Sequence, residues 1–280
     1  MALQLLIPID ATPGFTLNFC YLSYPPLQIT FLGTGTSSGV PMIGCDCEVC
    51  LSEDGRDKRL RSSILIQSPQ TTLVIDTGPD FRQQMLRNEV KKLDGVLLTH
   101  SHKDHIAGLD DVRAFNYFQQ TAMQVYGSRA TLNRIEQEFD YAFSKFKYPG
   151  IPSVTLHEIA ANDFVVKDLK INTLPVWHLN MPVLGFRMGS FTYITDANRI
   201  DESTKEKIKG SRVMVVNALR HETHVSHFTL KEALALADQL EVPEAYFTHI
   251  SHQMGLHKTI NRNLPQGRQL AYDGLKISME

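Results

Sequence analysis

The feature that most constrains this chain is a run of metal-binding side chains directly after a short apolar strand. Four such side chains stand within six residues: His100, His102, Asp104 and His105. Period-two alternation, continued past the strand, would send the first three to one side, and His105 would begin a turn toward a helix. Because such clusters rarely arise without a site, a pair of divalent ions is favoured over a solvated histidine-rich loop.

The composition indicates a globular protein. The chain has 280 residues, 42% of them hydrophobic and 21% charged, which excludes a disordered chain and a coiled coil. This length is compatible with a single domain of about 250 residues. The net charge of −2 argues against a general nucleic-acid binder, although a local basic patch stays open.

The beginning of the chain has the features of neither a membrane anchor nor a secretion signal. Its apolar start, Ala2 to Ile9, is interrupted by Pro8 and is too short to span a bilayer. A secretory signal needs a basic N-terminal region, and the first basic residue here is Arg56. We therefore expect a cytoplasmic protein that does not associate with membranes.

The order of apolar runs predicts a sandwich of sheets flanked by helices. Strands are predicted at residues 27–32, 63–67, 72–76, 95–99, 124–126, 154–158, 164–166, 171–174, 183–188, 191–195, 213–217, 245–248, 269–272 and 275–278. Helices are predicted at 80–88, 128–139, 203–209 and 230–240. Thr229 is a fitting N-cap for the last helix, with Glu232 as its capping-box partner. Asp273-Gly274 predicts a hairpin turn.

A second cluster consists of three cysteines in six residues: Cys45, Cys47 and Cys50. Thiolates at this spacing can converge on one tetrahedral zinc ion, and they need a fourth ligand: His252, His257 or a distant Cys. The clustering favours metal over disulfide bonds, with a redox-sensing thiol group as the alternative. The remaining cysteine, Cys20, is expected to serve as a small apolar residue.

Two other motifs lack the context that their usual function requires. The turn from Gly33 to Gly39 has the spacing G-x-G-x-x-x-G and leads into the cysteine cluster, so a tight loop is predicted rather than a dinucleotide site. The stretch from His221 to His224 is one residue short of the H-E-x-x-H zinc-protease motif. Its histidines either contact a substrate phosphate or are exposed, and His224 is the candidate substrate-binding residue.

The pattern His-x-His-x-Asp-His after a strand resembles the signature of the metallo-β-lactamase superfamily. The resemblance covers residues 28–280 and implies a single α/β domain of the αββα sandwich type, with residues 1–27 as an extension of unclear role. It also implies that a His, an Asp and a His at later strand ends complete the site. The chain offers His178, Asp196 and His249, each after a short apolar strand.

The same resemblance implies how the ligands divide between two ions. One ion would be held by His100, His102 and His178, and the other by Asp104, His105 and His249. Asp196 would bridge the two ions. Taken singly, His178 or His249 could instead be a core histidine with satisfied hydrogen bonds.

The motif C-x-C-x-x-C after a Gly-rich turn resembles the PhnP-type accessory phosphodiesterases of carbon–phosphorus lyase. In that family the fourth zinc ligand is a His three residues after the last catalytic-site His, and His252 stands three residues after His249. The resemblance thus implies a closed structural zinc site. It also implies that His227 is the general acid and that Asp104 takes part in catalysis. The alternative for His227 is a histidine near a helix N-terminus, where the dipole disfavours imidazolium.

The expected function is therefore hydrolysis of a small phosphodiester, best guessed as a cyclic ribosyl phosphate, with Mn²⁺ or Zn²⁺ at the two catalytic positions.

Three alternatives remain. A tRNA 3′-processing endonuclease shares the fold, but the region at residues 145–147 is too short for its basic arm. A lactamase or thioester hydrolase would not need the cysteines. A metal- or redox-sensing module would not be an enzyme. A homodimer is compatible with the sequence, which does not fix the oligomeric state.

Overall fold

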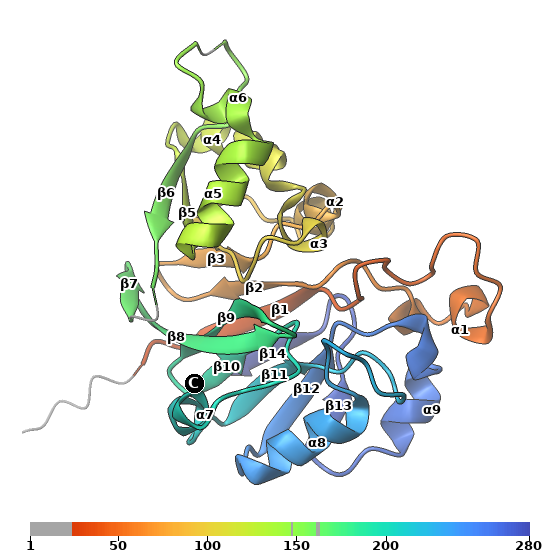
Figure 1. Ribbon diagram of the computed structural model, residues 1–280. Helices are drawn as coiled ribbons and strands as arrows, with labels where there is room; N and C mark the ends of the chain where they lie inside the picture. The colour runs from red at the N-terminus through yellow and green to blue at the C-terminus, as the bar shows by residue number, and fades with distance from the viewer. Residues whose placement is uncertain (1–23, 147, 161–162) are drawn as a thin grey trace, which may run out of the picture.

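The computed structural model describes residues 24–146, 148–160 and 163–280. Within these residues, two seven-stranded sheets pack face to face, and helices cover both outer faces (Figure 1). This arrangement confirms the predicted αββα sandwich. Cys20 lies outside the described residues, so its role as a small apolar residue stays a prediction.

Both sheets are mixed, with a parallel half that ends near the histidine cluster. The first sheet has the order β14-β1-β2-β3-β4-β5-β6, formed by Lys276–Met279, Leu27–Gly33, Ser63–Gln67, Thr72–Ile75, Gly95–Leu97, Met123–Gly127 and Val154–Glu158. The second has the order β13-β12-β11-β10-β9-β8-β7, formed by Arg268–Leu270, Glu244–Thr248, Val213–Asn217, Phe191–Tyr193, Met181–Met188, Leu169–His178 and Phe164–Val166.

The helices are short. They are α1 (Glu48–Leu51), α2 (Phe81–Arg87), α3 (Lys103–Ile106), α4 (Arg113–Gln119), α5 (Arg129–Glu138), α6 (Asp140–Phe143), α7 (Glu202–Ile208), α8 (Leu230–Gln239) and α9 (His257–Arg262). The capping box predicted for α8 is present, because Thr229 and Glu232 exchange side chain–backbone hydrogen bonds. None of the helices in the described part of the chain combines the length and apolarity needed to cross a membrane.

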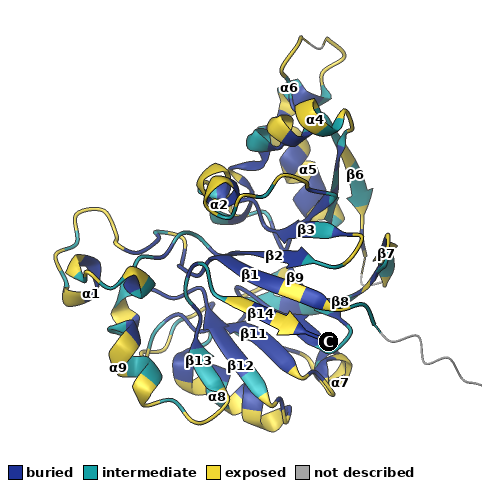
Figure 2. Cartoon of the chain, turned by 180° about the vertical axis from the view of Figure 1, so that it is seen from behind, coloured by how far each residue is buried: buried dark blue, intermediate teal, exposed yellow. Residues whose placement is uncertain are grey.

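Three apolar layers hold the sandwich together, and the strands that contribute to them are mostly buried (Figure 2). The layer between the sheets combines side chains from both, including Ile64 of β2 and Phe186 of β9. An outer layer joins the first sheet to α2, α4 and α5, and another joins the second sheet to α8. Because most strands are buried on both faces, they occur in the sequence as nearly continuous apolar runs.

The predicted hairpin at residues 269–278 is wrong. β13 pairs in parallel with β12 of the second sheet, whereas β14 pairs with β1 of the first sheet. The buried carboxylate of Asp273 accepts hydrogen bonds from the Leu60 N–H and the Thr34 hydroxyl. These contacts hold Asp273 against the chain between β1 and β2. Asp273 and Gly274 therefore link a strand of the second sheet to a strand of the first, and the two strands do not pair with each other.

The strand predicted at residues 171–174 extends over ten residues and passes through Pro175. β7 pairs only with residues 169–171 of β8, so the rest of β8 has a strand neighbour on one side, where β9 pairs with it. A proline, which lacks an N–H, is tolerated in such an edge position. The extension places His178 at the very end of the strand.

The strand predicted at residues 95–99 ends at Leu97, and α3 begins at Lys103 with His102 as its N-cap. Asp104 and His105 therefore lie in a helical turn. The predicted continuation of strand alternation as far as Asp104 is wrong. The sequence did not predict α1, α3, α4, α6 and α9. They are four to seven residues long, and a periodic signal over so few residues is weak.

Two glycines hold α3 against the end of β3. A Cβ at Gly78 would lie 2.1 Å from the carbonyl oxygen of Asp104, and a Cβ at Gly108 would lie 2.1 Å from the carbonyl oxygen of Gly78. The Thr77 N–H donates to the His105 carbonyl, 2.8 Å, in the same contact. The placement of Asp104 and His105 thus depends on backbone approaches that only glycine allows.

We predict that Gly78→Ala displaces α3 and weakens the histidine site. The inserted methyl group should cost about 1–3 kcal/mol in the free energy of unfolding, as overpacked positions do. Thermal unfolding and metal content measured on the purified variant provide the test. Gly55→Ala is the matched control, because a Cβ there meets nothing within 4 Å. A Gly78→Ala protein with the stability and metal content of the Gly55→Ala control would contradict this account.

Candidate metal centre

The carboxylate of Asp196 lies at the centre of the histidine cluster. Its Oδ1 is 2.9 Å from His249 Nδ1, and its Oδ2 is 3.4 Å from His105 Nε2 and 3.7 Å from His100 Nε2. The sets whose ligand atoms lie within 4.8 Å of one another are Asp104, His105, Asp196 and His249; His100, His102 and Asp196; and His178, Asp196 and His227. Asp196 belongs to each set, as a bridging ligand would.

The side chains come from strand ends that meet at one edge of the sandwich. His100 follows β4, His178 ends β8, Asp196 follows β10 and His249 follows β12. β10, β11 and β12 pair in parallel, so the residues after them emerge on the same side. Carboxyl ends of parallel strands are where α/β folds commonly place ligand sites.

The geometry of this cluster fits divalent ions. His100 Nε2, His105 Nε2 and His249 Nδ1 are buried, and none has a hydrogen-bond partner within the described residues. Ligands about 2.1 Å from a tetrahedral ion lie roughly 3.4 Å apart, close to the separations around Asp196. Buried ring nitrogens without partners are rare. Their convergence on one carboxylate is therefore best explained by cations held between them.

The other ring nitrogen of each buried histidine is held by a residue that sequence reasoning missed. His105 Nδ1 is 2.7 Å from Asp76 Oδ2. The Thr99 hydroxyl lies between Asp76 Oδ2, 2.8 Å, and His100 Nδ1, 3.0 Å. Such partners orient a metal-binding ring. Asp76 ended a predicted strand next to a Gly-containing turn, but nothing in the local sequence tied it to His105, 29 residues away.

Two further contacts orient the rings of His178 and His249. His178 Nδ1 is 2.9 Å from the carbonyl oxygen of Ser226. His249 Nε2 is 3.2 Å from the hydroxyl of Thr36, which lies in the Gly-rich turn predicted to be a tight loop. The turn therefore contacts the cluster through this hydroxyl.

The ionisable groups around Asp196 shift one another's pKa values. Although burial favours its neutral form, His249 and His105 hold the pKa of Asp196 well below its usual range. Burial, followed by the charge of His105, lowers the pKa of His100 well below its ordinary value. Burial opposes protonation of His105, but the surrounding carboxylates, Asp196 first, raise its pKa. Metal ions bind ionised carboxylates and neutral imidazoles. The carboxylates that favour a proton on His105 would equally favour a metal cation in its place.

His227 and His224 lie beside this cluster. The His227 ring is 4.6 Å from that of His178 and 4.8 Å from that of His249, and the His224 ring is 5.1 Å from that of His227. Burial, with the charge of His249, lowers the pKa of His227 to about 3, so its ring is neutral near pH 7. His221 turns elsewhere, with Nε2 3.1 Å from the Met254 carbonyl oxygen.

The three cysteines of the second cluster converge with a histidine from the other end of the chain. His252 Nδ1 is 3.3 Å from the sulfur of Cys45 and 3.3 Å from that of Cys47, and Cys50 joins the same group. These separations suit a tetrahedral zinc ion with Zn–S near 2.3 Å and Zn–N near 2.0 Å. His257, the other candidate, lies apart from the cysteines with Nδ1 3.2 Å from Arg59.

The thiols of this cluster differ in acidity. Contact with His252 lowers the pKa of Cys47 to about 6, whereas burial raises the pKa of Cys50 to about 11. A zinc ion binds thiolates, so Cys50 requires a cation beside it to lose its proton near pH 7. The Met42 N–H points at the Cys50 sulfur, 3.4 Å away, and supports the thiolate.

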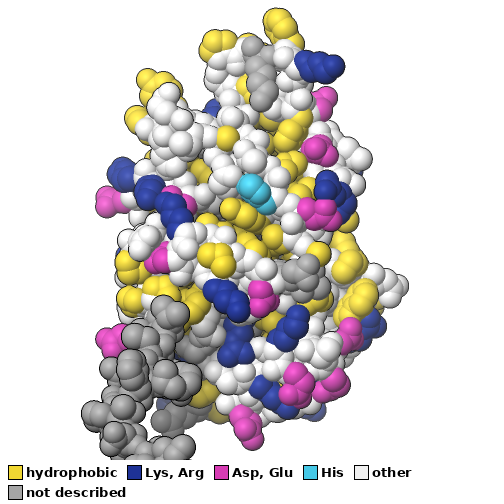
Figure 3. Space-filling view, turned by 90° about the vertical axis from the view of Figure 1, so that its left-hand side faces the viewer, with side chains coloured by type: hydrophobic (Ala, Val, Ile, Leu, Met, Phe, Trp, Pro, Cys, Tyr) yellow, Lys and Arg dark blue, Asp and Glu magenta, His cyan; other side chains and the backbone are white. Residues whose placement is uncertain are grey.

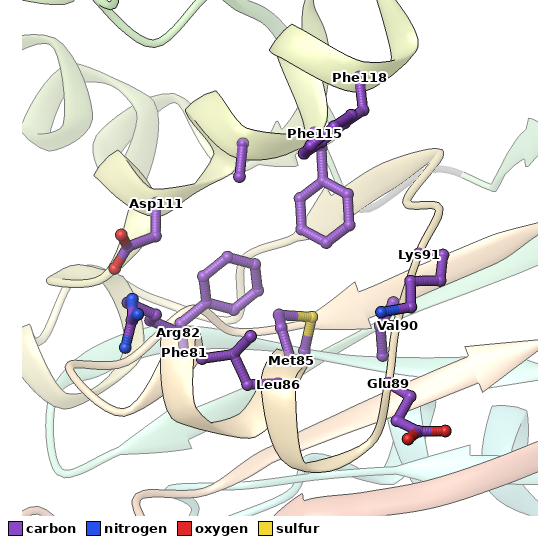
Figure 4. A pocket seen from close by; sticks show the side chains of 11 residues that line it. Phe81, Arg82, Met85, Leu86, Glu89, Val90, Lys91, Asp111, Phe115 and Phe118 are labelled. Carbon is purple, nitrogen blue, oxygen red and sulfur yellow. The ribbon is translucent and has the colours of Figure 1, made fainter.

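A cleft of about 440 Å³ opens beside His102 and His178. A larger groove, of about 540 Å³, lies between α2 and α4 and is lined by side chains such as Phe81, Met85 and Phe115 (Figure 4). This groove contains no histidine or cysteine. Its size alone does not mark a catalytic site, and the candidate ligands His102 and His178 line the smaller cleft instead.

Comparisons with known proteins agree with this geometry. A family model described as a β-lactamase superfamily domain matches residues 71–250. A crystal structure of a new diphosphatase from the PhnP family is 39% identical, covers 91% of this chain and 97% of its own, and has a TM-score of 0.85. The zinc-bound PqqB structure from Methylobacterium extorquens, 21% identical with a TM-score of 0.73, covers 90% of this chain and 100% of its own; it shows the fold alone.

Curated relatives carry several names. An octanoyltransferase of Porphyromonas gingivalis (strain ATCC BAA-308 / W83) is 39% identical over 257 residues, 91% of this chain and 52% of that protein. A ribonuclease Z of Acaryochloris marina is 28% identical over 169 residues, 58% of this chain and 47% of that protein. The chain spans about half the length of the curated relatives it matches.

We predict that Asp196→Asn loses metal ions from the histidine cluster while the fold persists. Asp196 adopts a positive φ of 52°, which asparagine tolerates, so the substitution removes charge without new backbone strain. Metal analysis and circular dichroism should show a folded protein with fewer bound ions. Asp163→Asn, on the surface, is the control. Full metal retention in Asp196→Asn would show that the carboxylate does not bridge.

A separate prediction concerns the cysteine cluster. Cys47→Ser should remove one zinc ion and lower the melting temperature, while the histidine cluster keeps its ions. Structural zinc contributes ~10 kcal/mol or more in small domains, but the large core here should leave the variant partly stable. Asp46→Asn, between two ligands in the sequence, serves as control. Unchanged zinc content and melting temperature in Cys47→Ser would exclude the proposed zinc site.

Proposed function

The chain belongs to the metallo-β-lactamase superfamily and, within it, to the PhnP family, and we propose that it is a metal-dependent hydrolase of small phosphodiesters. The best substrate candidate is a cyclic ribosyl phosphodiester. The observation that carries the proposal is the convergence of buried, unpartnered ring nitrogens on the carboxylate of Asp196. Two cations held by these side chains, beside an open cleft, would bind the negatively charged oxygens of a phosphate.

We propose the same division of ligands that the sequence suggested. His100, His102 and His178 would hold one ion, with the other held by Asp104, His105 and His249, and Asp196 shared. A histidine-rich set with a bridging carboxylate suits Mn²⁺ or Zn²⁺. When bound, the ions would hold phosphate oxygens and lower the pKa of a water toward ~7. Asp76, Thr99 and Thr36 orient the rings that bind them.

His227 is proposed to protonate the departing oxygen. It is 8% exposed and faces the cluster, and its Nδ1 has no hydrogen-bond partner within the described residues. Burial, together with the charge of His249, lowers the pKa of His227 to about 3. An acid needs the protonated ring, and negative charge on a bound phosphate favours that form. His224, next to His227, is the proposed phosphate contact.

A second candidate is a diphosphate substrate, favoured by the likeness to the 39% identical diphosphatase of the PhnP family. A diphosphate linkage presents the same kind of electrophile, a phosphorus atom that carries negatively charged non-bridging oxygens. We do not propose octanoyl transfer for this chain, because the match covers only 52% of the octanoyltransferase. We also propose that the protein works in the cytoplasm, where clustered thiols remain reduced and free to bind zinc.

RNA is a less favoured substrate. Ribonuclease Z relatives match only 58% of this chain. The segment between α6 and β6 is short, and basic and acidic side chains are interspersed over the face that carries β6 and β7 (Figure 3). A surface that binds nucleic acid would show clustered Lys and Arg. A metal- or redox-sensing module is disfavoured by the open cleft beside the histidines, which a sensor does not need.

The proposed function is tested by a hydrolysis screen with added Mn²⁺ or Zn²⁺. The panel should contain a ribose cyclic phosphate, bis(p-nitrophenyl) phosphate, a dinucleoside diphosphate and a short RNA. We expect turnover of the first two, with about three ions per chain by metal analysis. Cleavage of RNA alone would favour the endonuclease alternative. A protein with full metal content and no turnover of any phosphate ester would refute the proposal.

The role of His227 is tested within the same panel. His227→Ala should reduce kcat on the ribose cyclic phosphate by about 10²–10⁴-fold, the usual contribution of a general acid. It should lose much less on bis(p-nitrophenyl) phosphate, because nitrophenolate leaves without a proton. Equal losses on both substrates would make His227 a phosphate-positioning residue. A lost metal ion would make it a ligand.

A further inference from the structure

The cleft beside His102 and His178 has an apolar wall. Among the residues that line it are Leu179, Met181 and Val225. Leu179 is 50% exposed and Val225 is 71% exposed. Aliphatic side chains left this open next to a proposed catalytic centre indicate surface that a ligand covers.

The wall is held in place by a single amide side chain. Asn198 Oδ1 accepts a hydrogen bond from the Leu179 N–H at 2.8 Å, and Asn198 Nδ2 donates to the Val225 carbonyl oxygen at 2.9 Å. One residue thus joins the turn between β8 and β9 to the loop that precedes α8. The backbone segments that carry the two exposed side chains are therefore held together beside the histidines.

The backbone of Leu179 supports a functional purpose for this position. Its φ is +55°, a left-handed conformation that glycine and asparagine adopt far more readily than leucine. An exposed leucine in such a turn is unfavourable for folding both in its backbone and in its contact with water. Unfavourable conformations of this kind concentrate at ligand-binding positions.

The wall is continuous with the centre that would hold the phosphate. The carbonyl oxygen of Ser226 contacts His178 Nδ1, so the residue after Val225 orients a proposed ligand ring. His227 follows directly. A phosphate held at the histidines would therefore bring its substituents against Leu179 and Val225.

We propose that Leu179 and Val225 form a binding site for an aromatic ring carried by the substrate, such as a nucleobase or an aryl group joined to the phosphate directly or through a sugar. Among the described residues, no Lys, Arg, Asp or Glu lines the cleft, so a second phosphate would meet no lysine or arginine there. The proposal rests on the proposed phosphodiesterase function and specifies its substrate class. It separates ring-bearing phosphate esters from small polar ones.

The test compares two non-hydrolysable probes by calorimetry on the metal-loaded full-length protein. Phenylphosphonate and methylphosphonate share the headgroup and differ in the ring. We expect the wild type to bind phenylphosphonate about ten-fold tighter, the gain expected from burying one ring on an apolar surface. Equal affinity for the two probes would overturn the proposal.

The variants keep the shape of the wall and remove its apolar character. Leu179→Asn suits the positive φ, and Val225→Thr preserves the branched shape. The double variant should lose the preference for phenylphosphonate while its affinity for methylphosphonate and its metal content stay unchanged. Val165→Thr, at a 64% exposed valine of β7, is the matched control and should keep the preference.

The outcomes separate this proposal from the function on which it rests. If the double variant still prefers phenylphosphonate, or if it loses affinity for both probes together, the wall is not a specificity site. Hydrolysis in the substrate screen without any ring preference would leave the phosphodiesterase standing and remove this inference. Ring preference without hydrolysis of any phosphate ester would support the binding site and refute the phosphodiesterase.

Discussion

A buried carboxylate is the constraint on which this structure depends. Asp196 is 2% exposed, and the energetic cost of an ionised group at that depth must be offset by positive charge nearby. Histidine rings from separate strand ends approach its two oxygens with buried nitrogens that make no hydrogen bond within the described residues. The two sheets and their parallel halves bring those strand ends to one edge. The fold can thus be understood as the scaffold that assembles cation ligands around one anion.

The two proposed metal sites are mechanically connected. His249 faces the histidine cluster, and three residues later His252 reaches the cysteines. The chain between β1 and β2 contacts both ends of this segment, through Thr36 at His249 and through Cys45 at His252. A zinc ion at the cysteines would therefore hold the loop that positions a catalytic ligand. This connection would explain why the proposed structural zinc site lies so close to the proposed catalytic one.

The sequence failed where contacts between distant segments decide the outcome. Asp273-Gly274 has the local chemistry of a hairpin turn, but the buried contacts of Asp273 with Thr34 and the Leu60 backbone send its flanking strands to different sheets. Pro175 ended a predicted strand, yet β8 continues through it, because among the described residues only β9 pairs with this part of the strand. Asp76 showed no signal of its own, since its role depends on a histidine that folding brings to it.

By itself, the sequence determined the fold class, the family and the candidate ligands, because strand-end histidines, an aspartate and a cysteine triplet are local patterns with fixed spacings. The choice of His252 over His257 followed only from family resemblance, and folding brings His252 to the thiolates. Only the tertiary structure decided which nitrogen of each ring faces the centre and which residue holds the other. It also produced the apolar wall, because Leu179 and Val225 are far apart in the sequence and meet through Asn198. The orientation of a ring and the identity of its neighbours depend on how distant segments pack, and the spacing of residues in the sequence does not determine them.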